Sequence, residues 1–403
     1  MSKGENIVDL NNELPKHILV TNDFPPKIGG IQSYLFDLWK NIDPHSFVII
    51  TTFQQGCETF DSELDFKVIR LKKKFLAPTR GLEKVILKVV EDIDAQIVIF
   101  DPVFPLGLIA KRIKKRGIDY GIIIHGAELT VPANIPLVNT KIAKVISNSQ
   151  IVIEAGNYPW KVTQELLVKK GVKKEPYYVN VFPGIDGSRF LPIAGKIRDE
   201  ARKQFGLESS QKVVLSVSRL VRRKGMDTLI LAMSELSFMF PDIVCVIAGK
   251  GRDRSRLEKL IRKHDAPVNL LGEISQERLP DLYGCSDVFV MACRDRWFGL
   301  EREGFGIVFL EAQACGVPQI AGLSGGAGDA VVQDSTGYLV DSKNNPSSIV
   351  NSVYKLLSEE SLYNKMSEVS AERAHKYYDY KYLANQLLDG LKAYKINQPD
   401  KLS

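Results

Sequence analysis

The sequence has few of the features that mark membrane-spanning or disulfide-stabilised proteins. No apolar run approaches the roughly 20 residues that a membrane-spanning helix needs. The five cysteines are scattered without C-x-x-C spacing, and an odd number of them cannot form a complete disulfide framework. Residues 1–15 are polar and lack the apolar core of a signal peptide. We therefore expect a flexible leader on a cytoplasmic protein.

Motifs for metals, nucleic acids and dinucleotides are also missing. The five histidines form no H-x-x-H pair, and no cluster of His, Asp and Glu residues completes a metal site. No zinc finger, helix-turn-helix or aromatic RNA-binding signature is present. Gly249-Lys-Gly251 supplies only half of the dinucleotide fingerprint, and Gly29-Gly30 has a different spacing. We expect no metal, no bound cofactor and no nucleic acid partner.

The composition is that of a globular protein. Hydrophobic residues make up 44% and charged residues 25% of the chain, and the 403 residues suffice for two or three domains with sizeable cores. The net charge of +6 is mild. Composition therefore indicates a folded, multidomain chain and says little about its partners.

Short β-branched runs alternate with longer amphipathic segments in two successive series, which favours two Rossmann-like domains with parallel, doubly wound sheets. A turn cluster, Pro183-Gly184-Ile185-Asp186, separates the series. We predict domains over residues 1–185 and 186–378, and a C-terminal helix within 379–403 that packs back on the first domain. The predicted strands of the first series are His17–Thr21, Phe47–Thr52, Phe66–Leu71, Gln96–Phe100, Gly121–Ile124, Val145–Ser149 and Tyr178–Phe182. Those of the second are Val213–Val217, Ile243–Ala248, Val268–Leu271, Val288–Met291 and Gln319–Ala321.

A basic patch occupies residues 67–88, where eight basic residues face one acid, Glu83. Phe75, Leu76 and Leu82 lie between the charges. Such a segment can bind an anionic membrane surface, with each basic residue contributing on the order of 1 kcal/mol. A solvated loop and helix face would have the same composition. The basic residues are Lys67, Arg70, Lys72, Lys73, Lys74, Arg80, Lys84 and Lys88.

Glu303 and Glu311 lie on either side of a glycine-containing turn. The turn predicts a helix over Ile307–Ala314, ended by Gly316 and Pro318. The free amides and dipole of a helix N-terminus bind phosphate, and Glu303 just before it could meet hydroxyls of a group attached to that phosphate. Glu311 is expected more than two turns inside the helix, pointing elsewhere. Two glutamates at this spacing also occur on solvated helices, so the rest of the chain must decide.

A basic loop follows the predicted strand that ends near Ser218. Arg219 stands at the strand terminus, and Lys224 precedes Gly225, which introduces a helix. Because ligands bind at the carboxyl ends of parallel strands, both cations could reach a diphosphate and stabilise its developing charge. Arg222 and Arg223 are equally compatible with a role as surface residues.

Three further loops follow predicted strands. His125 ends the strand Gly121–Ile124 and suits hydrogen bonding to a sugar hydroxyl, although a lone histidine is more often structural. Gly29-Gly30 precedes a helix and allows close backbone approach to a ligand. The glycines after Leu323 fit a ligand loop or a plain turn equally well.

As an ordered set, these residues resemble glycosyltransferase family 4 of the GT-B fold over residues 17 to about 395. Finer details resemble the actinobacterial GDP-mannose-dependent phosphatidylinositol mannosyltransferases, closest to the type that adds a second mannose to phosphatidylinositol monomannoside. The details are the segment 22–34, Cys293-Arg294, and Ser324-Gly-Gly-Ala327, with Gly328 in place of a proline. The family set comprises Gly29-Gly30, His125, Pro183-Gly184-Ile185-Asp186, Arg219, Lys224-Gly225, Glu303 and Glu311.

The resemblance implies two Rossmann-like domains facing across a cleft and a retaining enzyme that needs no metal. It implies that GDP-mannose is the donor and a glycolipid such as phosphatidylinositol monomannoside the acceptor, at the inner face of the plasma membrane. The implied catalytic residues are His125, at the 6-hydroxyl of the donor sugar, Glu303, at its other hydroxyls, and Arg219 and Lys224, at the diphosphate. The amides of Gly306, Ile307 and Val308 would hold the distal phosphate, Glu311 the ribose, Gly29 and Gly30 the phosphate and acceptor side, and Asp23 and Gln32 the acceptor.

Retention normally requires a carboxylate nucleophile paired with an acid at about 5 Å. No second acid is placed for that role, so we expect a front-face reaction in which the leaving phosphate takes the acceptor proton. Two other functions remain open at this point. One is the same chemistry with a UDP-sugar and a polysaccharide or soluble acceptor. The other is a two-domain sugar-binding protein, against which the diphosphate-sized basic loop counts.

Overall fold

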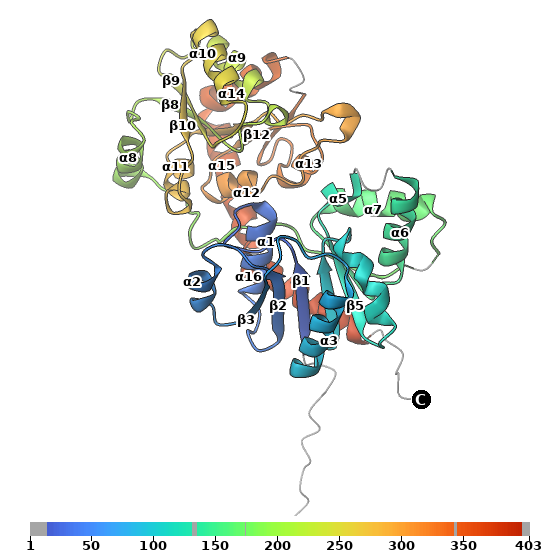
Figure 1. Cartoon of the computed structure of the whole chain (residues 1–403). Coiled ribbons are helices and arrows are strands. Elements are labelled where there is room, and N and C mark those ends of the chain that lie inside the picture. The colour runs from blue at the N-terminus through green and yellow to red at the C-terminus, as the bar shows by residue number, and fades with distance from the viewer. Residues whose placement is uncertain (1–13, 131–134, 174, 342–344, 397–403) are drawn as a thin grey trace, which may run out of the picture. The chain divides into compact units, whose positions relative to one another are not determined.

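The computed structural model describes residues 14–130, 135–173, 175–341 and 345–396, so almost all of the predicted leader lies outside it. The chain divides into two compact units, Met1–Phe182 together with Lys381–Ser403, and Pro183–Tyr380 (Figure 1). Each unit is a parallel α/β sheet with helices on both faces, as the alternating sequence pattern predicts.

The first unit contains a seven-stranded sheet in the order β3-β2-β1-β4-β5-β6-β7. Its central strands are buried along their whole length because helices cover both faces. The strands are β1 (His17–Thr21), β2 (Phe47–Thr52), β3 (Lys67–Leu71), β4 (Ile97–Asp101), β5 (Asp119–Ile124), β6 (Ile151–Glu154) and β7 (Tyr177–Asn180). The helices are α1 (Gly30–Trp39), α2 (Cys57–Ser62), α3 (Arg80–Ile93), η1 (Leu106–Ile109), α4 (Ala110–Lys114), α5 (Ala127–Thr130), α6 (Pro136–Ser147), α7 (Asn157–Lys169) and α16 (Tyr380–Ile396).

The second unit contains a six-stranded sheet in the order β10-β9-β8-β11-β12-β13. The strands are β8 (Lys212–Val217), β9 (Ile243–Ala248), β10 (Val268–Gly272), β11 (Val288–Met291), β12 (Gln319–Gly322) and β13 (Gly337–Val340). The helices are α8 (Gly195–Gln204), η3 (Arg222–Lys224), α9 (Met226–Leu236), α10 (Arg254–His264), η4 (Gln276–Arg278), α11 (Leu279–Gly284), η5 (Trp297–Gly299), α12 (Ile307–Ala314), α13 (Ala327–Ala330), α14 (Ser347–Ser358) and α15 (Glu360–Tyr377).

Both sheets reverse their strand order at one point, between β1 and β4 in the first unit and between β8 and β11 in the second. Ligands of open parallel sheets bind outside the carboxyl ends of the strands at such a switch point. The loops after these four strands are therefore where a functional site is expected in each unit.

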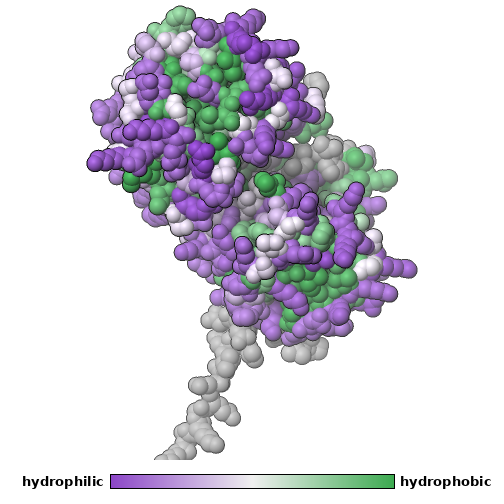
Figure 2. Space-filling model, turned by 60° about the vertical axis from the view of Figure 1, so that its left-hand side comes forward, coloured by the Kyte–Doolittle hydropathy of each residue, from purple (hydrophilic) through white to green (hydrophobic). Residues whose placement is uncertain are grey.

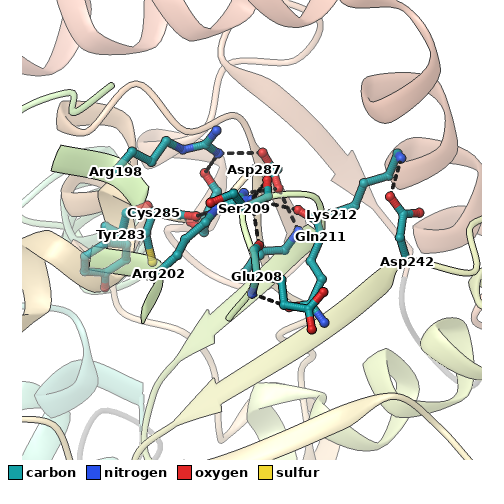
Figure 3. A network of polar contacts seen from close by, with 12 residues as sticks. Arg198, Arg202, Glu208, Ser209, Gln211, Lys212, Asp242, Tyr283, Cys285 and Asp287 are labelled. Atoms are coloured by element: carbon teal, nitrogen blue, oxygen red, sulfur yellow. Dashed lines mark hydrogen bonds and ion pairs between the residues drawn. The ribbon is translucent and has the colours of Figure 1, made fainter. Parts of the chain in front are cut away.

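An arginine network fixes the opposite, amino-terminal end of the second sheet. Arg202 of α8 is 3% exposed, and its guanidinium donates to the carbonyl of Cys285 and to Asp287 Oδ2, each at 3.0 Å. Arg198 pairs with the other oxygen of Asp287 at 2.6 Å, so two arginines converge on one carboxylate (Figure 3). Asp287 also accepts from the amide of Val213 in β8. The network ties α8 to the start of β8 and β11, away from the carboxyl ends.

Most predicted strands are present within one or two residues, but the strand predicted at Val145–Ser149 is wrong. Val145 and Ile146 lie in α6, where they share a buried face with Ile142 and Ala143. The strand of this region is β6, and it was not predicted; neither was β13. Two adjacent β-branched residues such as Val145 and Ile146 do not distinguish a buried strand from one face of a helix.

The C-terminal helix α16 belongs to the first unit from Lys381 onward. Its apolar face, which includes Leu383, Leu387 and Leu391, is buried. A side chain at Gly390 would press on Val179 of β7, so the helix packs closely against the edge strand.

No helix in the described ranges is long and apolar enough to cross a membrane. Hydrophilic side chains cover most of the face shown in Figure 2, with hydrophobic ones in smaller areas between them.

Candidate functional site

The loop after β8 is held against the end of β11 by a close backbone contact at Gly225. This residue has a φ of 71° and caps α9, and a Cβ atom there would overlap the carbonyl oxygen of Ala292. The preceding turn, η3, carries Arg222, Arg223 and Lys224. Lys224 is buried, and its Nζ lies 3.3 Å from Met291 Sδ at the end of β11. The close contact at Gly225 thus positions Lys224 at the switch point.

Two cations and one carboxylate form a buried cluster at this point. Lys224 Nζ lies 2.8 Å from Glu303 Oε2, and the Arg223 guanidinium bonds to the same carboxylate oxygen. The side chains of Glu303, Lys224 and Arg223 are 7%, 9% and 13% exposed. Burial alone would raise the pKa of Glu303, but the two cations outweigh it and hold the pKa below its usual value. The cluster therefore carries two positive charges and one negative charge at neutral pH.

The four cations of the predicted basic loop differ in position. Lys224 and Glu303 are brought together, and Arg223, which the sequence left open as a surface residue, joins them. Arg219 and Arg222 are exposed, and neither side chain bonds to another described residue. Arg219 thus stands at the strand terminus without contacting the cluster, and its role at a diphosphate stays a prediction.

The loop after β12 contacts the backbone of Glu303 and holds it in place. Gly325 has a φ of 48°, and a Cβ atom there would overlap the carbonyl oxygen of Glu303. The Ser324 hydroxyl accepts from the Glu303 amide at 3.0 Å and donates to Asp295 Oδ1 at 2.7 Å. Gly322 and Gly326 place this serine in the G-x-S-x-G spacing of a nucleophile elbow, but both its hydrogen bonds fix the Glu303 loop. The glycines after Leu323 therefore shape the site.

Helix α12 begins at Ile307 and ends at Ala314, as predicted. Within the described chain, the amides of Gly306, Ile307 and Val308 donate to no acceptor, and no side chain caps the helix. These amides and the helix dipole suit an anion. Glu311 is the fifth residue of α12, about one turn into the helix and not two as expected.

Glu311 is oriented by a buried tyrosine. The Tyr283 hydroxyl donates to Glu311 Oε2 at 2.6 Å, and Tyr283 is fully buried among Phe190 and Phe289. Burial and the nearby Glu311 carboxylate raise the pKa of Tyr283 well above its usual value, so it stays a donor. Glu311 is thus fixed in direction, although the structure does not join it to Glu303.

The half fingerprint Gly249-Lys-Gly251 has a packing role. A Cβ atom at Gly249 would overlap the carbonyl oxygen of Ser218, and one at Gly251 would overlap that of Leu220. The two glycines therefore hold the loops after β8 and β9 together, which explains their spacing without a dinucleotide.

In the first unit, three strand ends meet around Asp101. His125 follows β5, and its Nε2 lies 2.6 Å from Asp101 Oδ1. Thr21, the last residue of β1, donates to Asp101 Oδ2 at 2.6 Å. Asp101 was not singled out in the sequence, and its contact with His125 gives the predicted histidine an ionic partner.

The predicted acceptor residues lie in the loop and first turn next to this group. Gln32 donates to Asp23 Oδ1, which also pairs with Lys27 at 2.6 Å. Gly29 is the N-cap of α1 and Gly30 its first residue, so both glycines lie where the chain enters the helix. The structure brings Asp23, Gln32, Gly29 and Gly30 together near the end of β1.

Two acids, the partly buried Glu128 and the buried Glu154, lie close to His125. Glu128 accepts from the His125 amide at 2.7 Å, and burial raises its pKa. Glu154 ends β6 and is 0% exposed, and among the described residues neither of its carboxylate oxygens has a hydrogen-bond partner within geometric limits. Burial raises the pKa of Glu154 to about 8.

In the part of the chain that the structure describes, no three His, Cys, Asp or Glu side chains gather as metal ligands.

The sequence resembles known glycosyltransferases along most of its length. The model of group 1 glycosyl transferases matches residues 197–373. The GDP-mannose-dependent monoacylated alpha-(1-6)-phosphatidylinositol monomannoside mannosyltransferase of Corynebacterium glutamicum is 34% identical over 329 residues, which cover 81% of this chain and 84% of the relative. The GDP-mannose-dependent alpha-(1-6)-phosphatidylinositol monomannoside mannosyltransferase of Mycolicibacterium smegmatis is 32% identical over 80% of this chain and 85% of its own length.

Solved structures show the same fold. HepE of Anabaena in complex with UDP aligns with a TM-score of 0.77 at 17% identity, covering 94% of this chain and all of that chain. Sucrose-phosphate synthase of Thermosynechococcus elongatus aligns with a TM-score of 0.72 at 20% identity, covering 95% and 99%. These likenesses confirm the predicted GT-B class of fold. The sequence relatives are mannosyltransferases by name, so the alternative of a two-domain sugar-binding protein is set aside. The chain belongs to the group 1 glycosyltransferases, in one family with the phosphatidylinositol monomannoside mannosyltransferases.

Proposed function

We propose that the protein is a retaining mannosyltransferase that transfers α-mannose from GDP-mannose to a phosphatidylinositol monomannoside. One observation carries this proposal: the chain is 34% identical, over 81% of its length and 84% of the relative's, to a protein whose name states this donor and acceptor. The cluster of Arg223, Lys224 and Glu303 in the second unit and the segment with Asp23 and Gln32 in the first supply the chemistry that such a transfer needs.

The second unit suits a nucleoside diphosphate. Arg223 and Lys224 supply two cations, and the amides at the start of α12 supply neutral donors to a phosphate. An incoming diphosphate competes with Glu303 for the two cations and frees the carboxylate to accept hydrogen bonds from sugar hydroxyls. Glu311 binds the ribose, and Arg219 meets the diphosphate from the exposed end of β8.

The same cations stabilise the transition state. As the bond from the sugar to the phosphate breaks, negative charge grows on the leaving diphosphate. Fixed cations in a water-poor site stabilise this charge by about 3 kcal/mol each. The leaving phosphate takes the proton of the attacking hydroxyl on the same face of the sugar, so the α configuration is retained. The reaction then needs no metal, and transfer is expected to persist in EDTA.

The first unit suits the acceptor. Asp23 and Gln32 can exchange hydrogen bonds with ring hydroxyls of a mannosyl inositol headgroup, and Gly29 and Gly30 let the headgroup approach the backbone. His125, in the same unit, hydrogen-bonds the 6-hydroxyl of the donor sugar. The position of these residues at the ends of β1 and β5 supports the roles.

The basic patch (residues 67–88) brings the enzyme to an anionic membrane surface. Glu83 pairs with Arg112, and Phe75 is 49% exposed. Arg70 is unsuited to lipid, because it pairs with Asp61 at 2.7 Å, and Leu76 and Leu82 are core residues. The exposed basic side chains of the patch are Lys67, Lys72, Lys73, Lys74, Arg80, Lys84 and Lys88.

The test is transfer from a panel of labelled donors to phosphatidylinositol monomannoside in mixed vesicles. GDP-mannose, GDP-glucose, UDP-glucose and UDP-N-acetylglucosamine are compared at one concentration, and each product lipid is identified by mass. We expect mannose transfer from GDP-mannose with release of GDP. A preference for a UDP-sugar, or transfer to soluble acceptors alone, would replace the proposal by the corresponding alternative.

A further inference from the structure

We propose that Asp101 is a positioning residue for sugar transfer: it fixes the His125 ring with Nδ1 toward the substrate and ties that ring to the loop carrying Asp23. The inference rests on the proposed function, since it assigns a task within the same site. No motif in the sequence marks Asp101, and its place follows from the strand order of the sheet.

Asp101 uses both carboxylate oxygens at the switch point. It ends β4, between β1 and β5, and is 0% exposed. Register pairs Thr21 with Asp101, and the Thr21 hydroxyl donates to Oδ2 at 2.6 Å. On the other side, His125 Nε2 lies 2.6 Å from Oδ1. The carboxylate therefore spans the two neighbouring strand ends.

This contact determines which ring nitrogen is available. A carboxylate only accepts hydrogen bonds, so Nε2 of His125 carries the hydrogen in the pair. Nδ1 bonds to no residue that the structure describes. The ring also packs edge-on against Tyr34 at 5.6 Å between centroids, and the Tyr34 hydroxyl is itself held by the carbonyl of Val181. With Nε2 and one ring face engaged, Nδ1 is the atom left for a substrate oxygen.

The same carboxylate connects His125 to the acceptor loop. Thr21 Oγ1 donates to Asp101 and accepts from the Asp23 amide at 2.8 Å. The Asp23 carboxylate in turn accepts a hydrogen bond from the Gln32 side-chain amide. A continuous series of hydrogen bonds thus joins the His125 ring to the backbone amide of Asp23, the residue whose carboxylate is expected at the acceptor hydroxyls. A substrate group bound by Asp23 is held at a fixed distance from Nδ1.

Acidic groups surround the ring from several elements. Burial lowers the pKa of His125, but the carboxylates of Asp101, Glu128 and Asp23 outweigh it and raise the pKa above its usual value. Glu154 of β6 interacts electrostatically with His125, and Tyr34 of α1 packs against the ring. These acids favour the imidazolium form, in which Nδ1–H donates to a substrate oxygen. Asp101 is the only one of these acids in direct contact with a ring nitrogen in the described chain.

The first test is NMR of the histidine rings without substrate. The chain has only five histidines, so His125→Asn assigns the His125 signals directly. In the parent, we expect the neutral ring of His125 to carry its hydrogen on Nε2. Asp101→Asn retains an acceptor for Nε2–H but removes the charge, and should lower the pKa of His125 by at least one unit. A hydrogen on Nδ1 in the parent, or an unchanged pKa in a folded Asp101→Asn variant, would overturn the proposal.

The second test is the pH profile of transfer. Because activity needs the imidazolium, it falls as pH rises through the pKa of His125, and Asp101→Asn should move this limb to lower pH by the shift that NMR measures. The variant should lose tenfold or more in kcat/KM at a pH above the His125 pKa that NMR measures in the parent, and much less at a pH below the pKa of the variant. A loss that is equal at every pH would show a purely structural role and contradict the proposal.

Thr21→Val is the matched control, because it leaves the contact between Asp101 and His125 but removes the link to Asp23. We expect its His125 pKa to be unchanged and its acceptor KM to rise several-fold. A changed pKa would contradict the assigned path. If the parent transfers no sugar, the proposed function fails, while the NMR measurement still decides the role of Asp101.

Discussion

Lys224 Nζ lies 2.8 Å from Glu303 Oε2, and both side chains are less than one-tenth exposed. This pair joins the loop after β8 to the turn before α12, two segments that are about 80 residues apart in the sequence. Neither segment alone is specific: one is a run of basic residues, and the other a turn between two glutamates. Their contact at the switch point makes them one charged site.

Glu303→Gln should separate donor binding from catalysis. The amide retains the shape of the side chain but no longer competes with a diphosphate for Lys224 and Arg223. We expect GDP to bind at least as tightly as in the parent, while transfer falls about 100-fold to 1000-fold, the cost of about 3–4 kcal/mol for a lost transition-state contact. Calorimetry with GDP and a transfer assay measure the two effects. Loss of GDP binding in a variant that unfolds at the parent temperature would contradict the assigned role.

Arg223→Ala should weaken donor binding, and Arg222→Ala should not. The Arg223 guanidinium reaches Glu303, whereas Arg222 is its exposed neighbour on the same turn. We expect kcat/KM to fall about 10-fold to 100-fold for Arg223→Ala and to stay within twofold for Arg222→Ala. Steady-state kinetics with varied GDP-mannose measure both. Equal losses in the two variants would show a general effect of charge and not a site contact.

Gly325→Ala should disrupt the loop that supports Glu303. A Cβ atom at Gly325 would overlap the Glu303 carbonyl, and a φ of 48° is strained for alanine. At Gly328, by contrast, the nearest atom to a new Cβ is Leu339 Cδ1 at 3.9 Å. We expect Gly325→Ala to lose most of its transfer activity and Gly328→Ala to retain it. Normal transfer by Gly325→Ala would mean that this backbone contact does not position Glu303.

Removing three charges from the basic patch should release the protein from anionic vesicles. At about 1 kcal/mol for each lysine, a triple alanine variant at Lys72, Lys73 and Lys74 should bind roughly 100-fold more weakly. The control changes three exposed lysines outside the patch, Lys111, Lys115 and Lys169. Flotation at low and high salt measures binding, which salt should also reduce. Equal flotation of the two triple variants would make the patch a solvated face.

Glu154→Gln should change how stability depends on pH. Burial raises the pKa of Glu154 from 4.5 to about 8, so the folded state retains a proton that the unfolded state releases. The stability that this group contributes is fully present below pH 4.5 and is lost as the pH rises toward 8, by about 1.4 kcal/mol for each unit of pKa shift. Glutamine cannot ionise, so the parent should lose stability relative to the variant across this window. Thermal unfolding from pH 4.5 to 9 measures the difference, and parallel curves would contradict it.

Local sequence signals predicted those parts of the site that depend on one segment. Gly306 before the helix and Gly316 with Pro318 after it are start and stop signals, and they predicted both ends of α12 to the exact residue. Gly225 likewise marked the start of α9. At Val145–Ser149 the signal was ambiguous, since the two β-branched residues Val145 and Ile146 fit a strand or one helix face.

The residues that sequence reasoning missed depend on contacts between distant segments. Arg223 and Arg222 are neighbours in one basic run, and only the turn η3 and the contact at Gly225 decide which one reaches Glu303. Asp101 lies 80 residues from Thr21 and 24 from His125, and they meet because β4 lies between β1 and β5. An acid at the end of a strand beside the switch point was the available signal for Asp101.

The most direct test of the account is the structure of the sugar that the enzyme adds. Incubation of the protein with GDP-[13C]mannose and phosphatidylinositol monomannoside, followed by NMR of the extracted lipid, reports donor, acceptor and anomeric configuration together. We predict one added mannose in α linkage and an equal amount of released GDP. A β-linked mannose, or a lipid without added mannose while a UDP-sugar is consumed, would contradict the account.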